Sequence, residues 1–219
     1  RGADTMHCPI DGWEAAEPLS RSSWQQIWSA RKVGSTEVTG MLRVVTIPAY
    51  AGEAEALRDG GFSEERIKKH IADCAERCLR DGEALMASGS RRMPEIKAVK
   101  LRRSGDGDYR LWILSTYYPT FTKYYEGKRI SRGTLLSLFC DLCDAVGDYA
   151  SVGMVHGAVQ LENVYVDRVG SCLLGNPLFT RYYMSKFDEK LFNHDEFCVV
   201  SPDVGSVARA RTFAQKLHM

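Results

Sequence analysis

The strand-like segments of this sequence gather in two groups around one long helical segment, and this order constrains the fold more than any other feature. Residues 13–47 contain three β-like runs in a meander with a turn at residues 33–36, and Pro48 stops the third run. Residues 95–101 and 109–115 form a second pair, joined by a turn rich in glycine and aspartate. Because the strands cluster and do not alternate with helices, the order excludes a doubly wound parallel sheet and indicates an α+β fold.

Two segments of the sequence carry helical periodicity. The first begins with Ser63 as its N-cap, has Glu64 and Glu65 in its first turn, and ends near Gly89. Its apolar stripe comprises Ile67, Ile71, Cys74, Cys78 and Leu79. The second segment covers residues 133–150. Its expected apolar face comprises Leu135, Leu138, Phe139, Leu142, Val146 and Tyr149. A short β-pair at residues 164–167 and 171–174 is expected to follow.

Size and charge exclude several classes of protein. The 219 residues suit one domain or two small lobes that share a core. A net charge of +1 gives no strong field that would attract nucleic acid, and no apolar run approaches the length of a membrane span. The chain opens with Arg1, without a methionine, so a leader could have been removed. We therefore expect protein partners, no nucleic acid and no membrane span.

The segment of residues 154–167 is the most informative motif. It resembles the catalytic loop of protein kinases, in which a histidine and an asparagine stand at the separation of His156 and Asn163. Asn176 follows at the distance where that family places a metal-binding aspartate, and residues 201–203 resemble its later A-P-E triplet.

The resemblance covers residues 13–205 and predicts an α+β, bilobal protein kinase-like fold. It implies an N-terminal arm at residues 1–12, an N-lobe at residues 13–116 with a five-stranded sheet and one main helix, and a mostly helical, apparently shortened C-lobe at residues 117–219. The later motif leaves an alternative open, because residues 203–209 could instead represent a later helix of the lobe. The shortened lobe could equally reflect segments missing from the chain.

The residues at the expected catalytic positions do not suit phosphoryl transfer by a kinase mechanism. Ala158 stands in place of the catalytic aspartate, Gln160 in place of a lysine, and Asn176 in place of the metal-binding aspartate. His156 and Asn163 are retained. The segment of residues 19–28 stands where kinases carry a glycine-rich loop, yet it contains no glycine.

The N-terminal part of the expected site shows the same loss. Ser20, Ser22 and Gln25 occupy the glycine positions, so side chains, together with Trp24, are expected to fill the nucleotide cleft. Arg43 replaces the phosphate-binding lysine, and its acidic partner could be any one of three residues. These candidates are Glu76, Asp81 and Glu83. The sequence therefore predicts no catalysis, no bound cofactor and no metal.

Residues 44–50, the run at 111–119 and the loop at 153–170 are similar to the secreted rhoptry kinase-like family of coccidian parasites. This resemblance implies a pseudokinase, not an enzyme, that acts as a scaffold or allosteric regulator and is secreted into the vacuole, the cyst wall or the host cell. Two alternatives stay open. One is a divergent nucleotide-binding enzyme with atypical phosphoryl or nucleotidyl transfer, and the other is a structural component of a cyst wall or matrix.

Seven cysteines bear on this interpretation. Their spacing does not form paired metal-binding units, and we expect Cys74, Cys78, Cys140 and Cys143 to be buried apolar residues in helices. The cysteines outside the helices are better candidates for disulfides in a secreted protein. They are Cys8, Cys172 and Cys198.

Overall fold

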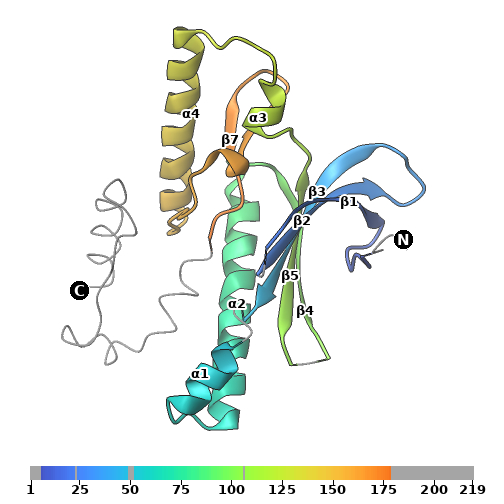
Figure 1. Ribbon diagram of the computed structural model, residues 1–219, viewed down its shortest axis with the longest axis vertical. Coiled ribbons are helices and arrows are strands. Elements are labelled where there is room, and N and C mark those ends of the chain that lie inside the picture. Colours follow the sequence, from blue (N-terminus) through green and yellow to red (C-terminus); the bar gives the residue numbers. More distant parts are fainter. Residues whose placement is uncertain (1–5, 23, 49–51, 106, 179–219) are drawn as a thin grey trace, which may run out of the picture. The chain divides into compact units, whose positions relative to one another are not determined.

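Five antiparallel strands form the sheet at the centre of the described structure (Figure 1). A computed structural model describes residues 6–22, 24–48, 52–105 and 107–178. The strands are β1 (Trp13–Arg21), β2 (Gln25–Lys32), β3 (Val38–Ile47), β4 (Ile96–Arg103) and β5 (Tyr109–Thr116). Their spatial order is β1-β2-β3-β5-β4, so β3 is the central strand. The strand segments predicted from sequence alternation are therefore confirmed.

The two faces of the sheet are buried by different parts of the chain. Alternation along β3 places Leu42 and Val44 on one face and Met41 and Arg43 on the other. The first face carries a core that also includes Ile10, Trp28, Ala30, Trp112 and Leu114. Residues 6–10, expected to belong to an arm, lie against this core, and the Lys100 ammonium donates to the Pro9 carbonyl at 2.7 Å.

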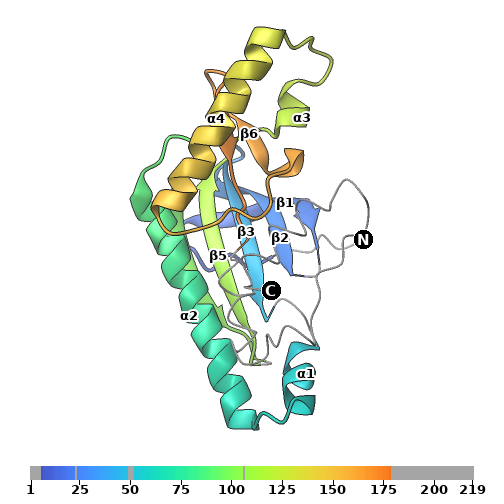
Figure 2. The same cartoon turned by 90° about the vertical axis from the view of Figure 1, so that its left-hand side faces the viewer.

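Helix α2 (Glu64–Ser88) runs lengthwise along the other face of the sheet, where it contacts β3, β4 and β5 (Figure 2). The predicted stripe is confirmed, because Ile67, Ile71, Cys74 and Cys78 are buried. The predicted ends are confirmed as well. Ser63 caps the first turn, and Gly89 takes the left-handed conformation after the last. A shorter helix, α1 (Glu53–Asp59), precedes it.

The N-cap of α2 makes a testable contribution to stability. The Ser63 hydroxyl oxygen accepts a hydrogen bond from the Arg66 amide at 3.3 Å. Replacing Ser63 with alanine is expected to lower the free energy of unfolding by about 1 kcal/mol, whereas glycine should cost only a few tenths. Urea denaturation of the two variants measures the difference, and equal losses would contradict a capping role.

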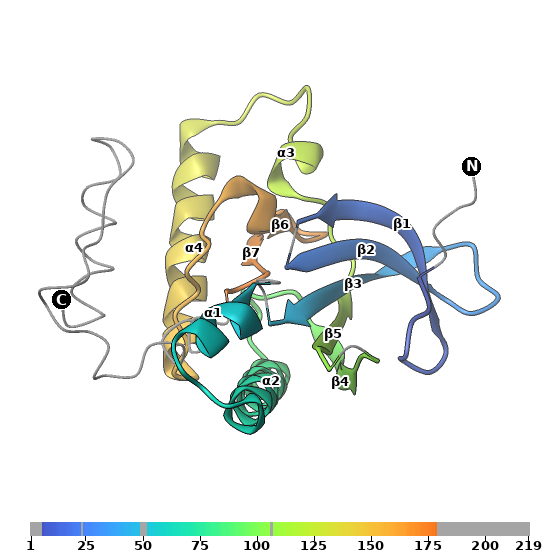
Figure 3. The same ribbon diagram turned by 60° about the horizontal axis from the view of Figure 1, so that its bottom comes forward.

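The remaining described elements form a helix and a small hairpin. They are α3 (Phe121–Tyr124), α4 (Arg132–Ser151), the 3-10 turn η1 (Leu161–Asn163), β6 (Val164–Val166) and β7 (Cys172–Leu174). The β6–β7 hairpin lies between α4 and the sheet (Figure 3). Two residues of α4 hold the hairpin in place. The Tyr149 hydroxyl donates a hydrogen bond to the Leu174 carbonyl at 2.9 Å, and the Asp141 carboxylate accepts one from the Cys172 amide at 2.9 Å.

Helix α4 presents a different face to the hairpin than its sequence predicts. Leu138 and Tyr149 are buried as expected, but they share the buried face with Asp141 and Ala145. Leu135, Phe139 and Val146 are exposed. The predicted apolar face is thus wrong in part. The reason is that Asp141 is required on the buried side, where it also pairs with Arg92 at 2.7 Å.

The cysteine predictions are partly wrong. Cys74 and Cys78 are buried, whereas Cys140 and Cys143 are exposed. All six cysteines in the described part of the chain are free thiols, so no disulfide joins Cys8 to Cys172. Cys198 and the motif at residues 201–203 lie outside the described residues. The lobe boundary at residue 116 and the bilobal arrangement stay predictions.

Across the described ranges, no helix is both long enough and apolar enough to pass through a membrane.

Candidate functional site

A cavity of about 650 Å³ lies between the β1–β2 hairpin and the segments around α3 and η1. Its apolar wall comprises Leu19, Trp24, Ile27 and Met41. Its hydroxyl and amide groups come from Ser20, Ser22, Gln25, Tyr117, Tyr118, Thr120, Thr122, Gln160, Asn163 and Tyr165. Its two charged residues are Lys123 and Glu162. The volume lies in the range of small-molecule sites, and the lining is mostly polar.

The β1–β2 hairpin forms one wall of this cavity. Ser22 closes the turn, because its backbone amide donates to the Gln25 carbonyl at 2.8 Å and its hydroxyl oxygen accepts from the Gln25 amide. Trp24 and Gln25 stand in the wall, and Arg21 is not one of the lining residues. Trp24 and Gln25 thus border an open volume, and the prediction that this segment keeps a nucleotide out of the cleft stays a prediction.

Arg43 lies behind the cavity wall. Its Nε donates to the Gln25 side-chain oxygen at 2.9 Å, and its guanidinium lies 5.7 Å from the centre of the Trp24 ring. It lines a separate space of about 30 Å³, together with Tyr149, Gly175 and Asn176. Burial lowers the pKa of Arg43 to about 10, so the side chain remains charged at neutral pH.

The three candidate acidic partners of Arg43 differ in how exposed their side chains are. Asp81 is buried, whereas Glu76 and Glu83 are exposed. Burial and the Asp81 carboxylate raise the pKa of the Cys78 thiol to about 12, and Arg43 opposes that shift. The Asp81 carboxylate and the Arg43 guanidinium therefore both influence the Cys78 thiol. Of the three candidates, Asp81 is the one that lies in the same buried environment as Arg43.

A buried amide network supports the floor of the cavity. The Asn163 amide nitrogen donates to the Ala158 carbonyl at 2.9 Å, and its oxygen accepts from the Asn176 amide nitrogen at 3.2 Å. The same Asn176 nitrogen donates to the Tyr165 hydroxyl oxygen at 2.6 Å. Asn176 holds a positive φ of 55°, which asparagine tolerates better than most residues. Asn163 and Asn176 therefore meet in a buried hydrogen-bond network that supports the loop.

His156 has a structural position. Its Nδ1 accepts from the Ala158 amide at 3.2 Å, so its Nε2 donates to the Gly175 carbonyl at 2.8 Å. Its ring meets the Tyr149 ring edge-on at 4.8 Å. Burial lowers the pKa of His156 to about 4, and the ring is neutral at physiological pH. It joins the loop before η1 to residues 175–178.

The structure thus divides the predicted site residues into two sets. Ser20, Ser22, Gln25, Gln160 and Asn163 meet around the cavity. The second set supports it from behind: Arg43, His156 and Asn176 through their side chains, and Ala158 through its backbone.

Sequence reasoning missed the two charged residues of the cavity. Lys123 lies in α3. The residue before this helix, Thr120, is its N-cap, and the Thr120 hydroxyl oxygen accepts a hydrogen bond from the Lys123 amide. Glu162 lies in η1, directly before Asn163, so the motif itself contained this carboxylate. An ammonium group can bind a phosphate, and a carboxylate can accept a proton from a hydroxyl. Within the described residues, no three His, Cys, Asp or Glu side chains gather as a metal site.

Comparison with known proteins finds relatives that are named as enzymes. The chain is 40% identical over 84 residues to a ribose-phosphate pyrophosphokinase of Clostridium perfringens, and 43% identical over 84 residues to that of Caldanaerobacter subterraneus. A third, from Clostridium tetani, is 37% identical over 82 residues. Each match covers 37% of this chain and 24% of the relative, so the chain spans about a quarter of the length of the curated relatives it matches. No known protein-family profile matches the chain.

These matches correct the functional interpretation drawn from sequence motifs. The relatives are named as enzymes, which overturns the prediction of a non-enzymatic pseudokinase of the rhoptry kinase-like family that acts as a scaffold or allosteric regulator. The motif resemblance rested on the spacing of a few residues, chiefly His156, Asn163 and Asn176. In the structure, these three residues make the buried hydrogen bonds that hold one loop.

Proposed function

We propose that this chain is part of an enzyme that transfers a pyrophosphoryl group from a nucleotide to a ribose phosphate. The observation that carries the proposal is the match to four proteins named ribose-phosphate pyrophosphokinase, at 35–43% identity. Because the matched segment is about a quarter of each relative, the reaction, the substrates and the site assigned below are all parts of the proposal. The cavity supports it by offering groups suited to a phosphorylated sugar.

The ribose phosphate is the ligand that suits the 650 Å³ cavity. Its wall presents hydroxyls from Ser20, Ser22 and Thr122 and amides from Gln25 and Gln160. Such groups exchange hydrogen bonds with sugar hydroxyls, and the flat face of Trp24 can cover the apolar side of a sugar ring.

Lys123 and Glu162 are the residues proposed to act on the reacting atoms. The acceptor hydroxyl oxygen of the ribose phosphate forms a bond to a phosphorus of the donor. The bond from that phosphorus to the donor's leaving oxygen breaks, and its electron pair stays on the departing nucleotide. Glu162 accepts the hydroxyl proton, and the Lys123 ammonium stabilises the charge on the transferred phosphate oxygens.

A secreted location, a protein partner and a bilobal kinase-like organisation stay predictions, and the proposed reaction depends on none of them.

Phosphorus NMR of the protein with ribose 5-phosphate, ATP and Mg²⁺ tests the reaction. We expect new phosphorus resonances of a pyrophosphorylated sugar that require both substrates. Glu162→Gln and Lys123→Met should each lower the rate at least tenfold, which is about 1.4 kcal/mol of transition-state stabilisation. Both residues are exposed, so the variants should keep the wild-type thermal midpoint.

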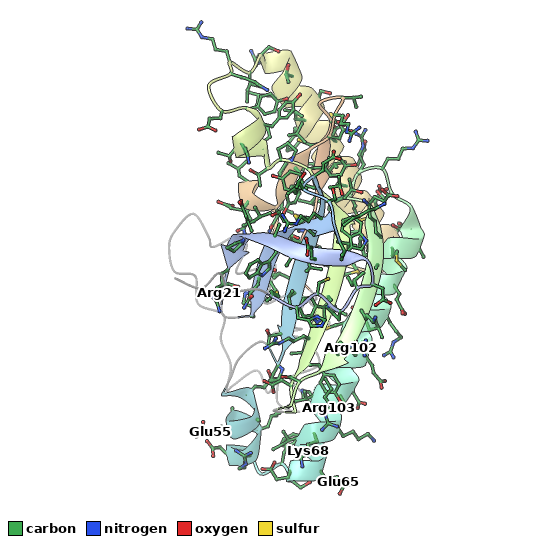
Figure 4. The ribbon with its side chains drawn as sticks, turned by 90° about the vertical axis from the view of Figure 1, so that its right-hand side faces the viewer. Arg21, Glu55, Glu65, Lys68, Arg102 and Arg103 are labelled. Carbon is green, nitrogen blue, oxygen red and sulfur yellow. The ribbon has the colours of Figure 1, made fainter. Side chains whose placement is uncertain are left out.

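Lys68→Met is the matched control, because Lys68 is an exposed lysine of α2 that does not line the cavity (Figure 4). This variant should keep the full rate. A wild-type protein that neither binds ribose 5-phosphate in calorimetry nor forms product would overturn the proposed function.

A further inference from the structure

The two edge strands of the five-stranded sheet differ in how well they can accept another strand. β1 carries Pro18, which has no backbone N–H, and its pairing with β2 is irregular on both sides of this residue. β4 contains no proline, and its pairing with β5 shifts only once, between Ile96 and Ala98. Within the described residues, β5 is the one strand beside β4. Alternate residues of β4 therefore direct their backbone groups outward along a regular edge.

β4 and β5 carry cations on one common face and no acidic side chain. Arg102 and Arg110 lie directly opposite one another in the strand register, so their side chains share a face. Lys100, two residues before Arg102, lies on the same face. We call these three residues the β4–β5 basic surface.

The basic surface holds uncompensated positive charge. Like charges directly opposite one another destabilise a sheet, and this is the relation of Arg102 to Arg110. The Lys100 ammonium donates to the Pro9 carbonyl, a partner without a negative charge. No carboxylate of the described residues forms an ion pair with any of the three cations. A bound anionic group would therefore relieve the repulsion between the two guanidinium groups.

The other face of β4 is aliphatic where it lies under α2. Val99 and Leu101 alternate with the cations and are half-buried. The helix packs closely there, because a β-carbon placed on Gly82 would lie 3.0 Å from a Val99 methyl carbon. A strand that paired with β4 would consequently meet cations on one face and aliphatic side chains on the other.

We propose that the outer edge of β4 binds an extended segment of a partner protein in which acidic and apolar residues alternate. The backbone of this segment pairs with β4 as an added strand. Its carboxylates lie beside the basic surface, where one next to Arg102 also reaches Arg110, and its apolar side chains cover Val99 and Leu101. Binding at this edge is independent of the pyrophosphoryl transfer proposed above.

Fluorescence anisotropy of the full chain with a labelled peptide of alternating glutamate and valine tests the proposal. Arg102→Glu and Arg110→Glu are each expected to weaken binding about tenfold, and added salt should weaken it too. Arg102→Glu converts a like-charge pair into an opposite-charge pair, so its thermal midpoint should not fall. A peptide of alternating lysine and valine should bind the double variant and not the wild type.

Arg21→Glu is the matched control, because Arg21 is an exposed arginine on β1, at the opposite edge of the sheet (Figure 4). This variant should bind the glutamate–valine peptide within about twofold of wild type. An equal loss of affinity with Arg21→Glu and Arg102→Glu would overturn the assignment to β4.

Two further peptides distinguish an added strand from general attraction between charges. A glutamate–valine peptide with every backbone amide methylated keeps its charge but cannot donate ladder hydrogen bonds, and a peptide with its glutamates grouped loses the alternation. Both should bind at least about tenfold more weakly than the alternating peptide. Equal binding of either one, or tighter binding of a single-stranded RNA, would overturn the proposal. Failure of the alternating peptide to bind the wild-type protein would overturn it as well.

Discussion

Replacing Asn163 with alanine is expected to lower the free energy of unfolding by about 3 kcal/mol. The substitution removes the donor to the Ala158 carbonyl and the acceptor for the Asn176 amide, and both Asn163 and Asn176 are buried. Each buried polar group left without a partner costs roughly 1–3 kcal/mol. Chemical denaturation monitored by tryptophan fluorescence measures the loss.

Gln160→Ala provides the control for this prediction, because Gln160 is an exposed amide only three residues earlier in the same loop. Its loss of stability should stay within about 0.5 kcal/mol. Equal effects of the two substitutions would show that the loop does not depend on the Asn163 network. A lower m-value for Asn163→Ala alone would indicate that the loop is already open in the native state.

Acidification from pH 6.5 to pH 4 is expected to destabilise the fold by about 3 kcal/mol through His156. Burial lowers the pKa of His156 to about 4 in the folded protein, whereas the unfolded value is near 6.5. The native state therefore favours the neutral ring. This stabilisation is fully present above pH 6.5 and is lost as the pH falls through the folded pKa.

Burial is the largest influence on the pKa of His156 and lowers it, whereas the hydrogen bond to the Gly175 carbonyl raises it in part. The positive charge of Arg43 on β3 lowers the pKa of His156 further, and the Tyr149 ring from α4 covers the imidazole. His70 has the opposite behaviour, because its hydrogen bond with Cys74 raises its pKa. The contribution of His70 to the free energy of unfolding is present below pH 6.5 and is lost only as the pH rises. His70 therefore does not explain a loss of stability between pH 6.5 and pH 5.

Denaturation curves at half-unit steps of pH check the prediction, with His156→Gln as the control. Glutamine can still donate to the Gly175 carbonyl but does not titrate. The variant should lose most of the slope between pH 6.5 and pH 5, where carboxylates contribute little. A wild-type protein with flat stability across that interval would contradict the burial of a neutral His156.

The local sequence determined the secondary structure of the described chain. The alternation of apolar and polar residues predicted the strands, and the apolar stripe and the capping residues predicted α2. These features depend only on neighbouring residues and on backbone geometry. The 13-residue separation of Asn163 and Asn176 matched the spacing of two positions in the kinase motif. Their chemical role did not follow from that spacing, since the same separation suits a metal site or a buried hydrogen bond.

Only the tertiary structure decided which side chains share a cavity and which face of α4 is buried. Lys123 and Glu162 are 39 positions apart, and no local pattern links them; the packing of α3 and η1 beside the β1–β2 hairpin places both in one wall. The buried side of α4 depended on Asp141, whose partners Arg92 and Cys172 lie far away in sequence. Periodicity records how apolar a helix face is, whereas burial also depends on long-range hydrogen bonds and ion pairs, which a sequence does not display.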